Sequence, residues 1–362
     1  ANVVRSVNSQ MVLAYWHIGR EIVQVLQGGD DRAVYGRKVL ESLSQRLGRR
    51  YGRGFSVTNF RYFRLFYQAY ADRTPVIRHK PCDELPVAPR EPKHHKAGDV
   101  LAELSLAVEH ADRIRGFSSG LSWSHYRTLT QVEHRSERLF YEIEAEKEGW
   151  SVPHLERQIH SLLFARLLKS RDKTGVLAMA TRGQIIEKPV DVLKDPYVLD
   201  FLDLPDTNKL HESDVEAAII RQLQEFLLEL GKGFAFVARQ KRLAYEDEHF
   251  YVDLVFYNTI LKCYLLIDLK IGKMSHQDIG QMDSYVRLFD DQFTTEGDNP
   301  TIGLILCAQK NEAIARYSIL SESKKIFTAR YVKYLPTEEE LKREIERERR
   351  LIEARQVGEE KH

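Results

Sequence analysis

The sequence has few of the features that mark secreted or membrane proteins. It contains 3 cysteines in 362 residues, and Cys82, Cys263 and Cys307 follow neither the spacing of a zinc site nor that of a disulfide framework. No apolar run approaches the roughly 20 residues that a membrane helix needs. No signal-peptide pattern opens the sequence either. We therefore expect reduced cysteines, no membrane partner and a cytoplasmic location.

An excess of charge of one sign is also missing. The 54 Lys and Arg residues nearly balance the 53 Asp and Glu residues, which gives a formal net charge of +1. Affinity for a polyanion must therefore come from a local patch. Between Arg46 and Lys80 there are nine basic residues and a single acid, interleaved with aromatic residues. From this patch we expect Arg53, Arg61 and Arg64 to contact nucleic acid.

Apolar residues at three- and four-residue steps predict helices in the N-terminal half. The expected helices are residues 2–27, about 35–49 and a third after Ser56, and helical periodicity returns over 99–170. Helix, short glycine-containing turn, helix is typical of a helix-turn-helix unit and equally of an ordinary helical bundle. The arginines on the third helix favour DNA contact. We expect residues 1–170 to form a helical N-terminal domain that binds DNA or a partner.

Three segments differ in composition from the rest of the sequence; the first of them lies within the predicted N-terminal domain. Prolines and scattered charges predict a linker or long loop over about 72–98, and residues 171–212 have the pattern of a mixed connector. Residues 337–362 are predicted to form a charged helical tail that is solvated or docks onto a partner. If copies of the chain associate, we expect the contacts in the helical N-terminal domain or in this tail.

The C-terminal half alternates between helical and strand-like segments. The predicted order is a helix over 213–230, strands over 234–240, 249–257 and 263–270, a helix over 276–291 and a strand over 301–307. This αβββαβ order indicates an α/β domain, which we place at residues 213–336.

Three charged residues stand inside these apolar strands. Alternation along a strand places Asp268 and Lys270 on one face, about 6.6 Å apart, and Asp253 lies in the preceding strand. Such charges are costly unless they are paired or bind a cation. A buried ion pair between Lys270 and one Asp would leave the other carboxylate uncompensated. We therefore favour a site for Mg²⁺, with Mn²⁺ as the alternative, because Mg²⁺ needs few carboxylates beside its waters.

An Asp followed by Asp-x-Lys on the next strand, after an acidic helix, resembles the PD-(D/E)XK nuclease superfamily. Longer runs narrow the resemblance to the YhcG-type nucleases of bacteria, including their N-terminal domain. These runs are Gly231–Gln240, Ile267–Lys273, Gly280–Tyr285, Leu13–Arg20, Gly54–Asn59 and Leu121–Tyr126. Val252 stands where the superfamily formula has Pro, and Asp268 replaces the commoner Glu; a strand and an oxygen ligand are kept in both cases.

The resemblance implies a multidomain α+β protein. A helical, helix-turn-helix-like N-terminal domain would precede a restriction-endonuclease-like α/β domain of αβββαβ order. The activity implied is that of a metal-dependent phosphodiesterase, a nuclease or endonuclease acting on DNA. Asp253, Asp268 and an acid of the preceding helix would bind the metal, and Lys270 would orient the metal-bound water or stabilise the transition-state charge. The alternatives are a non-catalytic DNA-binding or scaffold protein with a nuclease fold, and an RNA-directed nuclease.

Other candidate residues are less specific. We choose Glu216 as the acid of the helix, although Ser213-x-x-Glu216 is equally a capping box. Gln281 matches a glutamine that some relatives place near the active site; the alternative is that its side chain only hydrogen-bonds the backbone. The same two roles are open to Gln240.

Two basic residues near strand ends complete the candidates. Arg239 and Lys273 are candidate phosphate contacts.

Overall fold

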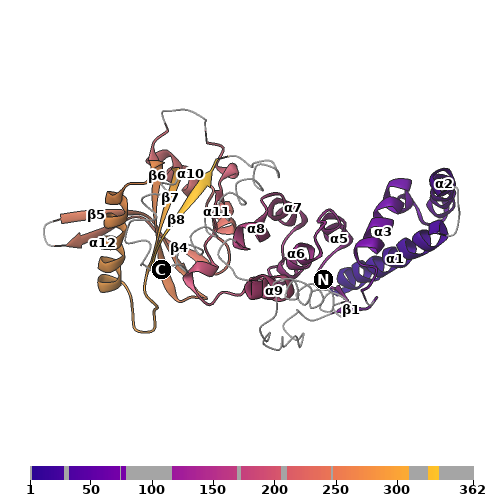
Figure 1. Ribbon diagram of the computed structural model, residues 1–362, viewed down its shortest axis with the longest axis horizontal. Coiled ribbons are helices and arrows are strands. Elements are labelled where there is room, and N and C mark those ends of the chain that lie inside the picture. Colours follow the sequence, from indigo (N-terminus) through magenta and orange to yellow (C-terminus); the bar gives the residue numbers. More distant parts are fainter. Residues whose placement is uncertain are drawn as a thin grey trace, which may run out of the picture. The chain divides into compact units, whose positions relative to one another are not determined.

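The computed structural model describes residues 2–27, 32–73, 75–78, 116–168, 173–204, 210–245, 248–309 and 325–333. The chain divides into two compact units, which we call the helical unit (1–159 with 172–184) and the sheet unit (160–171 with 185–362). Figure 1 shows the elements of both. Most of the expected linker at 72–98 and the whole expected tail at 337–362 lie outside the described residues.

The helical unit begins with three helices, as the apolar periodicity predicts. They are α1 (Asn2–Gln27), α2 (Arg32–Tyr51) and, after the short 3-10 helix η1 (Arg53–Phe55), α3 (Val57–Ala69). Ser56 caps α3, because its Oγ accepts a hydrogen bond from the Asn59 amide at 3.2 Å. Tyr15 of α1 stacks on Phe63 of α3 with ring centroids 4.2 Å apart. Gly19 permits this crossing, since a Cβ there would lie 2.1 Å from the Phe63 carbonyl oxygen.

Shorter elements complete the helical unit. They are α5 (Trp123–Leu129), α6 (Arg135–Lys147), α7 (Val152–His160), α9 (Lys173–Arg182) and a small parallel pair of strands, β1 (Ile77–Arg78) and β2 (Phe117–Ser118). α5 begins directly after Ser122, and α7 begins directly after Ser151.

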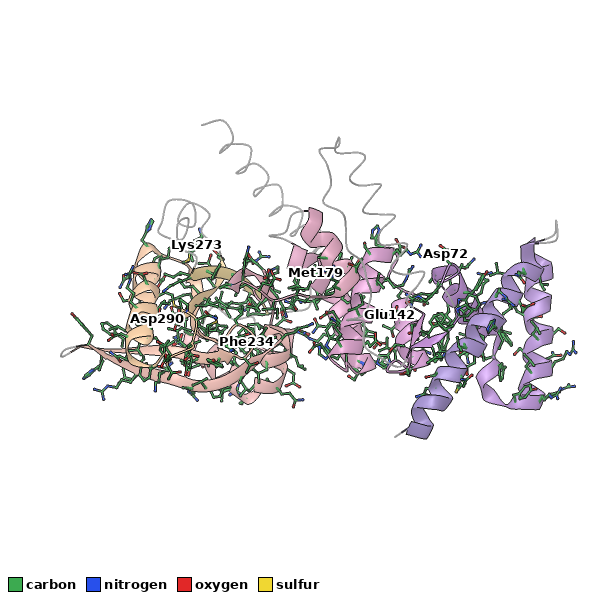
Figure 2. All side chains as sticks on the ribbon, turned by 90° about the horizontal axis from the view of Figure 1, so that it is seen from below. Asp72, Glu142, Met179, Phe234, Lys273 and Asp290 are labelled. Carbon is green, nitrogen blue, oxygen red and sulfur yellow. The ribbon has the colours of Figure 1, made fainter. Side chains whose placement is uncertain are left out.

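A fully buried ion pair lies within the helical unit. Arg73 Nη1 lies 2.8 Å and 2.9 Å from the two carboxylate oxygens of Glu142, and both side chains are at most 1% exposed. Arg73 also donates to the Gly116 carbonyl, and the Tyr126 hydroxyl donates to Glu142. Burial raises the pKa of Tyr126 well above its ordinary value, and the charge of Glu142 adds to this. Figure 2 shows Glu142 among the packed helices.

The sheet unit is built on six strands in the order β3-β8-β7-β6-β5-β4. The strands are β3 (Tyr197–Val198), β4 (Phe234–Tyr245), β5 (Glu248–Asn258), β6 (Cys263–Lys273), β7 (Ile302–Gln309) and β8 (Ile326–Val332). β4, β5 and β6 are antiparallel, whereas β6, β7, β8 and β3 pair in parallel. The helices are α8 (Leu163–Leu168), α10 (Glu212–Arg221), α11 (Leu223–Leu230) and α12 (His276–Gln292), with the 3-10 turns η3 (Pro189–Asp191) and η4 (Asp200–Leu202).

Helices cover both faces of this sheet. Ile219 of α10 packs with Leu254 and Ile267 on one face. Met282 of α12 packs with Leu266 on the other face. β6 is therefore apolar on both faces in its first half, as expected for a central strand between layers of helices. Its charged residues begin at Asp268, in the middle of the strand.

Several boundaries differ from the prediction. The helix expected over 213–230 is two helices that meet at Gln222, and β4 continues to Tyr245. The segment 171–212, expected to be a connector, contains α9 and the edge strand β3. A strand of two residues leaves no periodicity that the sequence could reveal.

Two of the three cysteines lie among the described residues. Cys263 and Cys307 are buried and unbridged, while Cys82 lies outside the described residues. In the part of the chain that the structure describes, none of the helices is both long and apolar enough to cross a membrane.

A second buried ion pair holds α8 in the sheet unit. Arg166 Nη1 lies 2.6 Å from Glu229 Oε1, and both side chains are fully buried. Arg166 also donates to the carbonyl of Pro196, and the Val198 amide donates to Glu229. α8, α11 and β3 are thereby joined through one set of hydrogen bonds.

Candidate active site

The site lies where β5 and β6 stop pairing. Their ladder runs from Asn258–Cys263 to Leu254–Ile267 and ends before Asp253 and Asp268. Beyond this point Asp253 Oδ2 accepts a hydrogen bond from the Leu269 amide at 2.9 Å. The carboxylate of Asp253 thus takes the place of a backbone acceptor, and this contact brings it next to Asp268.

Asp268 and Lys270 form an ion pair, with 3.0 Å between Nζ and Oδ2. Asp268 is 4% exposed. Burial raises its pKa to about 6; Lys270 opposes this shift, and the nearby charge of Asp253 adds to it. Burial also opposes the charge on Lys270, yet Asp268, Glu212 and Asp278 together raise the pKa of Lys270. Glu212 and Asp278 each place a carboxylate oxygen 3.8 Å from Lys270 Nζ.

Gln240 links two of the acids. Its Nε2 donates to Glu216 Oε2 at 2.6 Å and to Asp253 Oδ1 at 3.0 Å. Gln240 has a φ of 47°, in the left-handed region that non-glycine residues seldom adopt. Such backbone costs on the order of 1–3 kcal/mol and gathers at functional sites. With this backbone, both Gln240 and its neighbour Arg239 reach Glu216.

The capping role considered for Glu216 is wrong. α10 begins at Glu212, and its N-terminal amide bond is made by Asp214, whose Oδ2 accepts from the His211 amide at 2.8 Å. Glu216 lies one turn further on and is buried. Its Oε1 pairs with Arg239 Nε at 2.7 Å. Glu216 therefore belongs to the acidic cluster, and Arg239 neutralises a carboxylate here.

Gln281 lies on α12, and Lys273 is the last residue of β6. Gln281 Nε2 donates to the hydroxyl of Tyr285, one turn later on α12, and does not bond the backbone as its alternative required. Burial raises the pKa of Tyr285, with Gln281 opposing this and Asp268 adding to it. Lys273 is exposed at the end of β6 and lies at the outer margin of the unit in Figure 2.

The three arginines expected to bind nucleic acid belong to the helical unit. Arg61 is exposed on α3 and Arg64 is half-buried, while the side chain of Arg53 lies outside the described residues. α3 buries Phe60, Phe63 and Phe66, so its aromatic residues form core packing. Their contact with DNA stays a prediction, as does the helix-turn-helix role.

Two acids of the cluster had no distinguishing signal in the sequence. Glu212 occupies the first turn of α10, and Asp278 accepts a hydrogen bond from the Ser275 amide at the start of α12. Acids at these positions are ordinary helix-capping residues. Only the packing of both helix starts against β6 shows that they also face Lys270.

The donor set fits a hard cation held by two carboxylates. Among the described residues, no three His, Cys, Asp or Glu side chains are arranged to hold a metal ion. Arg239 and Gln240 hold the carboxylate of Glu216. Asp253 and Asp268 remain adjacent at the end of the β5–β6 ladder. Asp268 Oδ2 is buried and lies 3.0 Å from Lys270 Nζ. Mg²⁺ suits such a site because it keeps several waters.

Comparison with known proteins gives matches over almost the whole chain. The YhcG PDDEXK nuclease domain family matches residues 190–346. The DUF1016 N-terminal domain family matches residues 1–86 and 101–166. A relative from Escherichia coli strain K12 named "Putative nuclease YhcG" is 38% identical over an alignment of 361 positions, which covers 97% of this chain and 90% of the relative.

Two solved structures are more distantly similar. A structure titled as an EndoMS-dsDNA2 complex has 16% identity and a TM-score of 0.26, over 37% of this chain and 50% of that chain. A repair endonuclease from Pyrococcus abyssi has 16% identity and a TM-score of 0.24, over 34% and 49%. The match thus spans about half the length of each solved chain.

Proposed function

Because this chain belongs to the family of nucleases that carry the YhcG PDDEXK domain behind a DUF1016 N-terminal domain, we propose that it hydrolyses phosphodiester bonds in DNA with the help of Mg²⁺. The expected fold class, a helical N-terminal region followed by a restriction-endonuclease-like α/β domain, is confirmed. The observation that carries the proposal is the meeting of Asp253, Asp268 and Lys270 at the end of the β5–β6 ladder.

Asp253 and Asp268 would hold the cation. When bound, a divalent cation activates a water, neutralises charge on the phosphate and helps the leaving oxygen. Asp268 has to lose its proton to serve as a ligand. Burial raises its pKa to about 6 in the absence of metal, so protons compete with the cation as the pH falls. Lys270 stays protonated beside Asp268 and can orient the attacking water or stabilise the negative charge of the transition state.

Glu216 is the third proposed ligand. In the structure Arg239 and Gln240 hold its carboxylate, so ligation by Glu216 requires them to release it. The side chain of Arg239 is 49% exposed, which leaves it room to turn toward a substrate phosphate. Arg239 and Lys273 are proposed as phosphate contacts, and Gln281 as a residue near the reacting groups.

The helical unit is proposed to bind the substrate. Arg53, Arg61 and Arg64 would contact phosphates, because the basic patch is the strongest local concentration of positive charge in the sequence. Action on DNA in the cytoplasm, and self-association through the helical unit or the C-terminal tail, also belong to this proposal.

A recognition-only role is less well supported. The raised pKa of Asp268 means that its ionised form is held at a cost to stability. A fold used only to bind nucleic acid would have no need of that carboxylate.

The proposal is tested by incubating the full chain with supercoiled, linear, single-stranded and branched DNA, and with RNA, in Mg²⁺, Mn²⁺ or a chelator. Cleavage should require the metal and should be lost in Asp268→Ala. The control is Asp291→Ala, which removes an exposed acid from α12. Equal cleavage by the parent and Asp268→Ala would refute the site assignment, and faster cleavage of RNA than of any DNA would move the proposal to an RNA-directed nuclease.

A further inference from the structure

The β4–β5 hairpin extends beyond the rest of the sheet. β5 pairs with β6 only over Leu254–Asn258, whereas it pairs with β4 as far as Glu248. Residues 241–245 and 248–252 therefore form a two-stranded projection, which we call the arm (Figure 1).

One face of the arm is covered by α12 and the residue that follows it. Leu243 and Val252 are buried in the core that α12 builds on this side of the sheet. Phe250 lies against Tyr285, with ring centroids 6.1 Å apart. Lys241 Nζ lies 4.2 Å from the ring centroid of Phe293.

The opposite face of the arm is open. Arg242 pairs with Tyr251, and Ala244 pairs with His249; all four are exposed. These residues alternate with those buried against α12, so their side chains point away from that helix. Arg242 Nη2 lies 2.8 Å from His249 Nε2, an interaction that orients the guanidinium next to Tyr251.

This open face begins at the candidate active site. Tyr251 precedes Asp253 by two residues on β5, a distance of about 7 Å along a strand on the same side. On β4, Arg242 follows Gln240 by two residues, and Gln240 bonds both Asp253 and Glu216. The row of side chains therefore continues from the acidic cluster onto the arm.

The chemistry of the row suits unpaired nucleotides. An exposed tyrosine at a strand surface is common by itself, but here the ring is 51% exposed, stands beside a guanidinium and adjoins the acids proposed to act on phosphate. Aromatic rings stack on unpaired bases, and arginines contact the phosphates between them. Bases within a duplex present no free face to a protein ring.

We propose that the open face of the arm binds unpaired nucleotides of DNA next to the phosphate that is cut. Tyr251 stacks on a base, and Arg242 contacts the backbone. The enzyme then prefers single-stranded DNA, or duplex ends and junctions that open locally, over intact duplex. This inference rests on the proposed nuclease function.

Tyr251→Ala tests the stacking, and the chain provides a matched control. Tyr245 lies on the same arm and is 56% exposed, but it follows Lys241 and Leu243 at two-residue steps and so points to the opposite face. Binding to a labelled oligothymidine and to a closed hairpin duplex is measured with the metal chelated. Tyr251→Ala should weaken binding to the single strand about tenfold and leave duplex binding unchanged. Tyr251→Phe and Tyr245→Ala should match the parent.

Three results would overturn the inference. Tyr251→Ala could bind the single strand as tightly as the parent, Tyr245→Ala could weaken it as much, or Tyr251→Ala could convert a dimer into a monomer in size-exclusion chromatography, which would make the face a contact between copies. Cleavage assays distinguish a failure of this inference from a failure of the proposed nuclease function. If Asp268→Ala abolishes cleavage while Tyr251→Ala cuts single strands at the parental rate, the nuclease assignment stands and the arm assignment fails. If the parent cuts no nucleic acid with any metal, the nuclease assignment fails.

Discussion

The two units bury charge in opposite ways. In the helical unit, Arg73 and Glu142 are buried together, and each has neutral hydrogen-bonding partners as well. In the sheet unit, Asp268 is buried beside Lys270 within reach of further acids. The first group pairs one cation with one carboxylate, whereas in the second the carboxylates outnumber the cations.

This difference separates a structural role from a functional one. A buried pair with matched charges joins the elements around it, and losing one partner destabilises the fold strongly. A carboxylate cluster that lacks counter-charge is costly to the fold and is ready to accept a cation. Arg166 and Glu229 belong to the first kind although they lie in the sheet unit. Burial alone therefore does not mark the active site; the unbalanced charge does.

The largest expected effect is on cleavage. Lys270→Ala should lower the cleavage rate by about 10³-fold, since it removes the cation nearest to Asp268, while the melting temperature changes little. Cleavage assays beside thermal melts provide the measurement, and Lys262→Ala, an exposed lysine before β6, is the control. A large fall in melting temperature with parental cleavage would place Lys270 with the structural pairs and break the comparison.

The matching change in the helical unit should affect stability. Glu142→Gln leaves the buried Arg73 without its counter-charge, which should cost about 3–5 kcal/mol of unfolding free energy. Denaturant unfolding measures this, with the exposed Glu133→Gln as the control. A loss of less than about 1 kcal/mol would contradict the assignment.

The free energy of unfolding should depend on pH in a way that shows how much the ionised carboxylate of Asp268 destabilises the fold. Its pKa in the folded protein, about 6, exceeds the ordinary value of 3.8. The folded protein therefore holds the Asp268 proton more tightly than the unfolded chain does. The resulting contribution to the free energy of unfolding is fully present below about pH 4 and is lost as the pH rises through about 6. Without metal, Asp268→Asn should be more stable than the parent by on the order of 1–3 kcal/mol at pH 7. The gap should close at pH 4.

Denaturant unfolding with a chelator across this pH range measures the gap, and Asp291→Asn serves as the control. A gap that stays constant with pH would show that Asp268 does not titrate as described.

Glu216→Gln should reveal whether Glu216 binds metal. The amide is a poor Mg²⁺ ligand, so we expect the Mg²⁺ concentration for half-maximal cleavage to rise about tenfold. Stability should change little, because Glu216 does not cap α10. Glu225→Gln, at an exposed position on α11, is the control. An unchanged Mg²⁺ requirement would leave Glu216 as a partner of Arg239 alone.

The smallest effect is expected from the basic patch. Replacing Arg53, Arg61 and Arg64 together with Gln removes up to three phosphate contacts. Binding to duplex DNA should weaken, and its salt dependence should flatten by a slope of about 0.9 per lost contact. A titration across salt concentrations that gives the parental affinity and slope would make the helical unit a protein-interaction module.

The sequence predicted the parts of the fold that repeat. Periodicity placed the helix at residues 2–27 with its observed bounds, and alternation in apolar strands identified β5 and β6. It could not reveal β3, which depends on a partner strand far along the chain. It also could not predict the kink at Gln240, because a left-handed glutamine has no local signature.

The sequence likewise predicted only part of the candidate site. Asp253, Asp268 and Lys270 stand out because charge interrupts an apolar pattern. Glu212 and Asp278 do not, since acids at helix starts are common. The capping alternative for Glu216 failed because the helix begins one residue before the serine that would have capped it.

The alternating course of the chain between the units affects how the protein is made. α8 belongs to the sheet unit, yet α9 after it returns to the helical unit. Arg166 is synthesised 63 residues before Glu229, a wait of roughly 3–13 s at the usual speed of a ribosome. During that time α9 can complete the helical unit, while the leucines of α8 have no core to enter. Because the segments of the two units alternate along the chain, no single recombination point can exchange one unit without dividing the other.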